Sequence, residues 1–218
     1  MFSAHNITLY HGSRVRVPVP LLERCRDRND YGRAFYCTLE RDLACEWACP
    51  DGRSPGYVNE YTLDTEGLEV LDLDEDPNGV LAWIAVLLTN RTLDKEWNVD
   101  GDTARFVNGF AVDLAPFDIV EGYRADDSYF SIARAFVSGT ITDAQLARTL
   151  GLDGLGRQVA LRTERALGAL RFVGAAAVDA SVFGPRRLAR DRRARSALLG
   201  IRSEGGKASG RRIYELGV

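Results

Sequence analysis

The chain has 218 residues, of which 45% are hydrophobic and 27% are charged, as in an ordinary soluble globular protein of one large domain or one domain with an appendage. Its longest apolar run, residues 80–89, is about half of the roughly 20 residues that a membrane-spanning helix needs, so we expect no membrane contact. No secretory signal pattern is visible in residues 1–20, and the four cysteines fit a reducing compartment. We therefore expect a cytoplasmic protein.

The first half of the chain mixes strand and helix patterns. Short or alternating apolar runs bounded by turn residues predict strands at residues 7–10, 34–38, 57–63 and 68–73. Apolar side chains at helical spacing predict a helix at residues 39–49, and a continuous apolar run predicts a buried helix at residues 80–88. Residues 94–115 show only weak periodicity and are expected to form a long loop.

The second half continues this mixture. Strands are predicted at residues 117–123, 158–161 and 171–178. Helices are predicted at residues 129–137, 143–150, 164–170 and 186–199. Thr142 or Asp143 is suited to cap the second of these helices, because its side-chain oxygen can accept a hydrogen bond from the first turn. Since strands and helices interleave without a regular βαβ repeat, the predicted fold class is α+β.

Charge divides the chain unevenly. The whole chain carries −3, whereas residues 185–218 hold ten Lys and Arg against three Asp and Glu, which gives +7 and leaves −10 for residues 1–184. We therefore expect a domain at residues 1–180 and a basic C-terminal tail at residues 181–218. Such a tail suits an acidic partner or nucleic acid, but a solvated basic helix with a frayed end is the favoured explanation. The acidic remainder argues against a wide nucleic-acid interface on the domain.

Two short motifs carry the chemistry of this sequence. The first is Leu-Tyr-His-Gly-Ser at residues 9–13, and the second is a glycine turn that leads into the strand containing Tyr36. His11 can hydrogen-bond a ribose hydroxyl, Gly12 allows close approach of the backbone, and Ser13 offers a hydroxyl. The ring of Tyr36 can stack on a flat heterocycle. Taken separately, a turn at residues 11–13 and a core tyrosine would explain the same residues.

In this order and spacing, residues 9–47 resemble the donor-binding region of ADP-ribosyltransferases of the diphtheria-toxin and poly-ADP-ribose-polymerase branch. Those enzymes carry a histidine in H-G-(S/T), a tyrosine after a G-x-G turn, and a second ring-stacking aromatic residue eleven positions later. Here that position is Trp47, which is equally explained as core filler on a helix. The resemblance implies split mixed β-sheets with surrounding helices, and NAD as a co-substrate held by His11, Gly12, Ser13, Tyr36 and Trp47.

The chain is still more similar to a bacterial family of uncharacterised ADP-ribosyltransferase-like proteins. That family has the motifs L-Y-H-G-S, D-F-G-x-G-F-Y-x-T, W-A, D-I-V-x-G-x-x-A-D-D and a late N-Q-x-x-F-x-T-E strand. The corresponding stretches in this chain are residues 9–13, 30–38, 47–48, 118–127 and 157–164. Its members resemble toxins of toxin–antitoxin modules or effectors. The resemblance therefore implies an antitoxin as a partner, or delivery into another cell.

Departures from the wider pattern affect the expected reaction. Ala34 stands at the second glycine of G-x-G, and Gln158 stands where the polymerases have a glutamate. Glutamine keeps a hydrogen-bond acceptor but lacks the charge, so single transfer is expected rather than chain elongation. Asp127 is the first candidate for the missing carboxylate and Glu164 the second, although each is also suited to the start of a helix.

Together these residues predict a mono-ADP-ribosyltransferase. It would cleave NAD at the nicotinamide–ribose bond through an oxocarbenium-like transition state and pass ADP-ribose to a protein or nucleic-acid acceptor. The expected catalytic residues are His11, Tyr36, Gln158 and Asp127. Two alternatives stay open: an NAD glycohydrolase with water as acceptor, and a catalytically silent module that binds NAD or a partner. No metal site is expected, since the chain has only two histidines.

Overall fold

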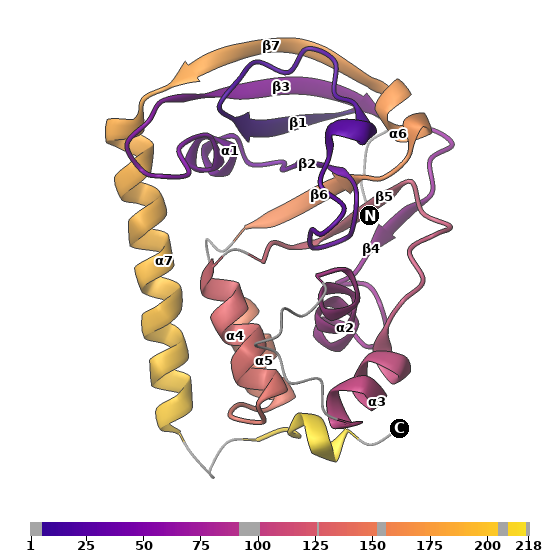
Figure 1. Ribbon diagram of the computed structural model, residues 1–218, viewed down its shortest axis with the longest axis vertical. Coiled ribbons are helices and arrows are strands. Elements are labelled where there is room, and N and C mark those ends of the chain that lie inside the picture. Colours follow the sequence, from indigo (N-terminus) through magenta and orange to yellow (C-terminus); the bar gives the residue numbers. More distant parts are fainter. Residues whose placement is uncertain (1–5, 92–100, 126, 152–155, 205–208, 217–218) are drawn as a thin grey trace.

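The computed structural model describes residues 6–91, 101–125, 127–151, 156–204 and 209–216 (Figure 1). Helices and mixed sheets are both present, so the α+β class is confirmed. In chain order the elements are β1 (Asn6–Ser13), η1 (Leu22–Arg24), β2 (Phe35–Cys37), α1 (Arg41–Ala48), β3 (Gly56–Asp64), β4 (Val70–Asp72), α2 (Val80–Asn90), α3 (Gly101–Phe110), β5 (Ile119–Tyr123), α4 (Asp127–Val137), α5 (Asp143–Leu150), β6 (Arg157–Leu161), α6 (Glu164–Gly168), β7 (Leu170–Val178), α7 (Ala180–Ser203) and η3 (Ile213–Glu215).

The strands form two separate sheets that meet at one point. One sheet has the order β1-β3-β7 and is antiparallel, and the other has the order β2-β6-β5-β4, with only β4 and β5 parallel. The sheets are joined by a pair of backbone hydrogen bonds between Tyr10 and Thr38, at N–O distances of 2.8 and 2.9 Å. This bridge places His11 of β1 next to Tyr36 of β2.

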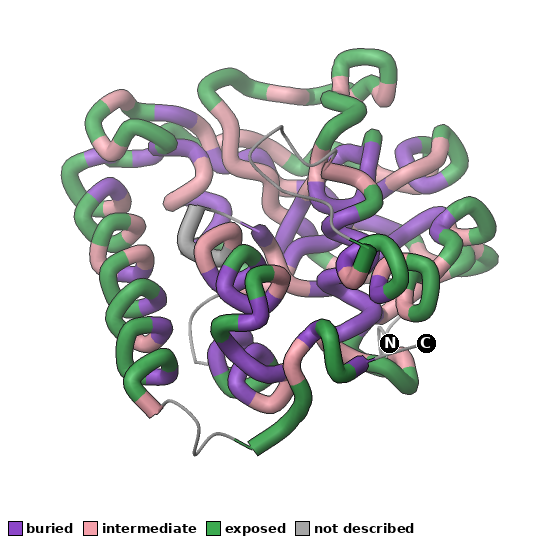
Figure 2. Tube along the Cα trace, turned by 60° about the horizontal axis from the view of Figure 1, so that its bottom comes forward, coloured by how far each residue is buried: buried purple, intermediate pink, exposed green. Residues whose placement is uncertain are grey.

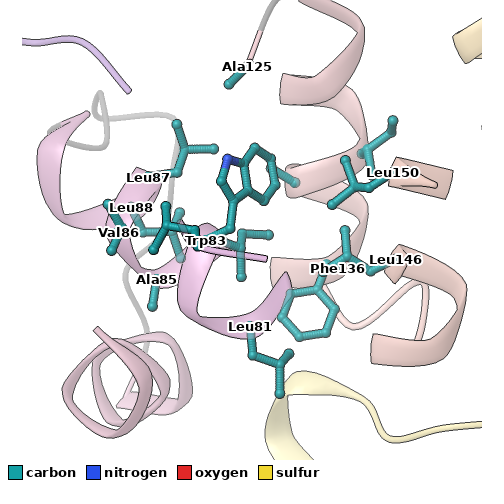
Figure 3. Close-up of a cluster of buried hydrophobic side chains, with 14 of the residues drawn as sticks. Leu81, Trp83, Ala85, Val86, Leu87, Leu88, Ala125, Phe136, Leu146 and Leu150 are labelled. Carbon is teal, nitrogen blue, oxygen red and sulfur yellow. The ribbon is translucent and has the colours of Figure 1, made fainter. Parts of the chain in front are cut away.

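Each face of the four-stranded sheet is buried in a different core. Successive side chains of a strand point to opposite faces, so Ile119 and Leu161 contact the three-stranded sheet while Val120 and Ala160 face the helices. The helical core surrounds α2, whose residues 81–88 are all buried (Figure 3). Its Trp83 donates a hydrogen bond from Nε1 to the carbonyl of Tyr123, at 2.9 Å. None of the helices in the described ranges is both long and apolar enough to span a membrane.

The expectation of a loop at residues 94–115 is wrong for its centre, because residues 101–110 form α3. This helix buries only Thr103 and Phe106, and Phe106 packs edge-on against Phe136 of α4. With so few apolar contacts, its sequence period is too weak to recognise. The cap of α5 is Thr142 rather than Asp143: its hydroxyl accepts from the N–H of Gln145, and the Gln145 side chain accepts from the N–H of Thr142.

The C-terminal segment packs on the same core as the rest of the chain. The predicted boundary near residue 180 coincides with the junction between β7 and α7, where Asp179 caps the helix. Helix α7 is longer than the predicted residues 186–199 and contributes Ala194, Leu198 and Ile201 to the core around α2. On its inner side the buried Arg190 pairs with Glu46 of α1 at 2.6 Å.

Gly12 is required where β1 passes under α1. A Cβ atom at this position would overlap the carbonyl oxygen of Ala44 and lie 2.8 Å from Cβ of Trp47. Both neighbours are fixed by the helix, so neither can move away without displacing α1. The missing side chain therefore serves the packing of a helix that carries Trp47.

We expect Gly12→Ala to destabilise the fold by about 1–3 kcal/mol through this overlap. Urea denaturation measures the loss. Gly200→Ala is the matched control, because a Cβ there meets nothing within 4 Å and alanine in a helix interior is favoured over glycine by about 0.5–1 kcal/mol. A Gly12→Ala protein as stable as the wild type would contradict the close packing of β1 and α1.

Candidate functional site

A cavity of about 470 Å³ lies at the junction of the two sheets. Its walls come from β1, β2, α1 and β6, from the segment before β2 and from the ends of α2 and β5. The lining residues are His11, Gly12, Ser13, Arg26, Asn29, Asp30, Tyr36, Trp47, Arg91, Arg124, Ala125 and Gln158. Six residues expected to act at the site lie together in this lining: His11, Gly12, Ser13, Tyr36, Trp47 and Gln158.

His11 is oriented by the backbone of β2. Its Nδ1 lies 2.7 Å from the carbonyl oxygen of Tyr36, and its ring lies against Phe35 with centroids 4.4 Å apart. Because a carbonyl can only accept, Nδ1 carries the proton and Nε2 keeps its lone pair in the neutral ring. Burial lowers the pKa of His11 below the ordinary histidine value, against the opposing effect of the Tyr36 hydrogen bond. The ring is therefore neutral at pH 7 and offers an acceptor nitrogen.

Tyr36 is held by its hydroxyl. The hydroxyl donates to the carbonyl of Gly32 at 2.8 Å and accepts from the N–H of Tyr31 at 2.9 Å. Burial raises the pKa of Tyr36 above the usual phenol range, with a further contribution from the charge of Asp30, so the side chain stays neutral. With both hydrogen bonds made inside the turn, the ring contributes a flat, fixed surface to the cavity wall.

Ser13 is engaged by its own turn. Its hydroxyl donates to the carbonyl of Val15 and lies 3.3 Å from Nδ2 of Asn59. Asn59 also donates to the carbonyls of His11 and Val15, at 3.2 and 3.3 Å. Asn59 is fully buried opposite His11 in the next strand, so it fixes the shape of the chain where β1 ends.

Trp47 faces the same cavity from α1. The guanidinium carbon of Arg124 lies 4.6 Å from the centre of its ring, a cation–π arrangement. The Nε1 atom of Trp47 is buried and has no hydrogen-bond partner in the described part of the chain. A buried donor of this kind costs about 1–3 kcal/mol when unsatisfied, so a ligand with an acceptor would gain from reaching it.

Gln158 is fixed by two acceptors. Its Nε2 donates to Oδ2 of Asp30 at 2.8 Å and to the carbonyl of Tyr123 at 3.3 Å. Neither partner can donate, which identifies the nitrogen end of the amide. A glutamate at this position would present oxygen to both acceptors. The local structure therefore favours glutamine at this position.

The carboxylate of the site is Asp30, which the sequence analysis did not select. Its side chain is 2% exposed and pairs with Arg91 at 2.5 Å, and Oδ2 accepts from the backbone N–H of Ala125 at 2.9 Å. Asp30 opens the D-Y-G-R-A-F-Y run, and Arg91 directly follows the apolar helix α2. Both residues stand beside recognisable motifs, but no local sequence pattern marks them as a buried pair.

The acidic residues named from the sequence have other positions. Asp127 is the first residue of α4, but its side chain lies outside the described part of the protein. Glu164 starts α6 and is not among the described residues that line the cavity. Asp118 of the D-I-V motif accepts from Thr163 at 2.6 Å and pairs with Arg165 at 2.5 Å, so it connects β5 to α6.

A second cavity of about 870 Å³ adjoins the first. Five residues line both: His11, Ser13, Arg26, Asn29 and Tyr36. The remaining wall of the second cavity combines the apolar segment at residues 17–21 with Arg16 and Arg24. The two spaces are therefore compartments of one cleft, and arginines lie along its length.

The fold and site define an α+β protein with a cationic cleft between two sheets. A family described as "Protein of unknown function (DUF3990)" matches residues 7–172, which is most of the chain, and the chain belongs to this family. No curated protein and no solved structure gives a significant match.

We expect Gln158→Glu to destabilise the protein by about 2–4 kcal/mol at pH 8, because it places a second carboxylate beside buried Asp30. The like charge raises the pKa of the new carboxyl group above its value in the unfolded chain. The stability of this variant is therefore highest at low pH and falls as the pH rises through the raised pKa. Urea denaturation at pH 5 and pH 8, relative to wild type at each pH, measures the effect.

Two further variants separate charge from packing. Gln158→Ala removes the same hydrogen bonds without adding a charge, so its destabilisation should be nearly independent of pH. Asp30→Asn combined with Gln158→Glu removes the like charge and should recover most of the pH-dependent loss. An equal loss for Gln158→Glu at both pH values would contradict the contact between residues 30 and 158.

Proposed function

We propose that this protein is a mono-ADP-ribosyltransferase that uses NAD as its co-substrate. The observation that carries the proposal is the convergence of four side chains from four separate elements on one cavity: His11 (β1), Tyr36 (β2), Trp47 (α1) and Gln158 (β6). These are the side chains that the resemblance assigns to NAD. They are up to 147 residues apart in sequence, and packing requirements alone do not bring such groups together around a cavity.

The charge of the cleft supports a dinucleotide. Arg26, Arg91 and Arg124 line the smaller cavity against one carboxylate, Asp30, which Arg91 already neutralises. Arg26 and Arg124 are the other two cationic side chains of this lining, and arginine binds a pyrophosphate well through its fixed donors. The second compartment adds Arg16 and Arg24 beside apolar surface, which suits a phosphate and a heterocycle together.

The chain's own groups can assist cleavage of the nicotinamide–ribose bond. Tyr36 and Trp47 present ring surfaces for the nicotinamide, and neutral His11 offers Nε2 as an acceptor for a ribose hydroxyl. Positive charge develops on the ribose as the bond breaks. The amide oxygen of Gln158 supplies a dipole there instead of a full charge, which favours a single transfer to a well-positioned acceptor.

Incubation of the full chain with NAD labelled in the adenosine part, with and without cell lysate, tests this proposal. We expect nicotinamide release and labelled macromolecules with the wild type. His11→Ala and Tyr36→Ala should each lower the rate by about 100-fold or more, since both remove groups that position the substrate. Tyr36→Phe keeps the ring and loses only the hydroxyl contacts, so its loss should be smaller. Tyr214→Ala is the control, an exposed aromatic residue outside both cavities.

The products distinguish the alternatives. Free ADP-ribose without labelled macromolecules would identify an NAD glycohydrolase instead. Calorimetric binding of NAD without nicotinamide release, with lysate present, would identify a silent binding module. If the protein neither binds NAD nor releases nicotinamide, the proposed NAD site is ruled out.

We expect nicotinamide release to be constant with pH above neutrality and to fall only below pH 6.5, the ordinary value for histidine. Burial lowers the pKa of His11, so Nε2 stays unprotonated until the pH falls below that lowered value. Initial rates from pH 5 to pH 9 measure the profile. His11→Gln has no titrating group at this position, and any residual activity should lack the acidic fall. An unchanged fall in that variant would assign it to another group.

A further inference from the structure

We propose that the outer face of α7 is a docking surface for an acidic amphipathic helix of a partner protein. The surface is defined by Leu188, Arg192, Arg195, Leu199 and Arg202, and is called the seam below. Its residues follow one another at intervals of four, three, four and three. That spacing is the heptad pattern by which one helix lies along another.

The seam is exposed along a flank of α7. The neighbouring side of the helix carries the buried residues Arg190, Ala194, Leu198 and Ile201, which pack on the core (Figure 2). By contrast Leu188 is 54% exposed and Leu199 is 66% exposed. These two leucines supply apolar surface in line with the arginines, and a partner helix would remove that surface from water.

Charge sets the chemistry of the partner. Arg192 and Arg202 are exposed and form no ion pair within the described part of the chain, and Arg195 pairs with Asp191 of its own helix. The rest of the protein is acidic, since residues 1–184 carry −10, so α7 is the face to which an acidic helix would be steered. Leu188 and Leu199, on either side of Arg192 and Arg195, require apolar partners at matching positions.

Arginines and leucines on one line favour an acidic helix as the partner over a second copy of α7 and over nucleic acid. A second copy of α7 would place arginine against arginine or leucine in either orientation. A nucleic-acid backbone would satisfy the arginines but leave Leu188 and Leu199 without apolar partners. An acidic helix with leucine and glutamate along its own seam matches both, over about 21 Å from residue 188 to residue 202 at 1.5 Å per residue.

The test uses the full chain and a synthetic helical peptide of roughly 21 residues, three heptads, with Leu and Glu along one seam. A second peptide of the same composition has these residues moved off the seam. We expect the seam peptide to bind at least about tenfold more tightly than the rearranged peptide by calorimetry, since only it buries Leu188 and Leu199. Equal binding of the two peptides would overturn the proposal, because net charge alone would then explain it.

Variants of the protein identify the face. Leu188→Ser with Leu199→Ser, and Arg192→Glu with Arg202→Glu, should each weaken binding of the seam peptide by about tenfold or more. Arg193→Glu is the control for charge: it reverses one charge on α7, half of the change in the double arginine variant, at an exposed position off the seam, and binding should change by less than about threefold. Undiminished binding by the leucine variant would overturn the proposal.

A duplex RNA of roughly 20 base pairs tests the other class of partner. Tighter binding of this duplex than of the seam peptide, lost in Arg192→Glu with Arg202→Glu but kept in the leucine variant, would assign the face to nucleic acid. No seam residue lines either cavity, so these results do not depend on whether the protein cleaves NAD.

Discussion

The site depends on one buried carboxylate. Asp30 is 2% exposed, and its two oxygens accept from Arg91 at the end of α2, the N–H of Ala125 after β5 and the amide of Gln158 on β6. Leaving such a group without partners would cost several kcal/mol, so these elements are held in register with the segment before β2. That segment also carries the turn that fixes Tyr36. Asp30 and its donors therefore set the positions of both the Gln158 amide and the Tyr36 ring.

The same carboxylate determines which chemistry the cavity supports. Because Asp30 and the Tyr123 carbonyl both accept, residue 158 must donate, and glutamine satisfies this where glutamate cannot. The charge of Asp30 is directed to Arg91, so the cavity as a whole remains cationic. The site thus combines a buried ion pair with a neutral amide, and the same carboxylate holds both.

Much of the fold could be predicted because its signals are local. The apolar helix at residues 80–88, the strands near residues 7–10 and 57–63, and the paired motifs around His11 and Tyr36 all follow from spacing along the chain. Asp30 could not be selected in this way, since its partners lie 61, 95 and 128 residues away. Helix α3 buries only two side chains, and it packs chiefly against α2 and η3, which lie outside its own segment, so no local pattern records its contacts.

Helix α7 joins the C-terminal segment to the site. Its inner face holds Arg190, whose side chain is 5% exposed and pairs with Glu46, the residue next to Trp47 on α1. Removing one partner of such a buried pair costs about 3–5 kcal/mol, so α1 and α7 move as one unit unless that energy is supplied. Arg186 and Arg187 add contacts from α7 to Asp42 and to the carbonyl of Cys49. The basic segment is therefore a support for the Trp47 wall of the cleft, and its outward face is the part left available for a partner.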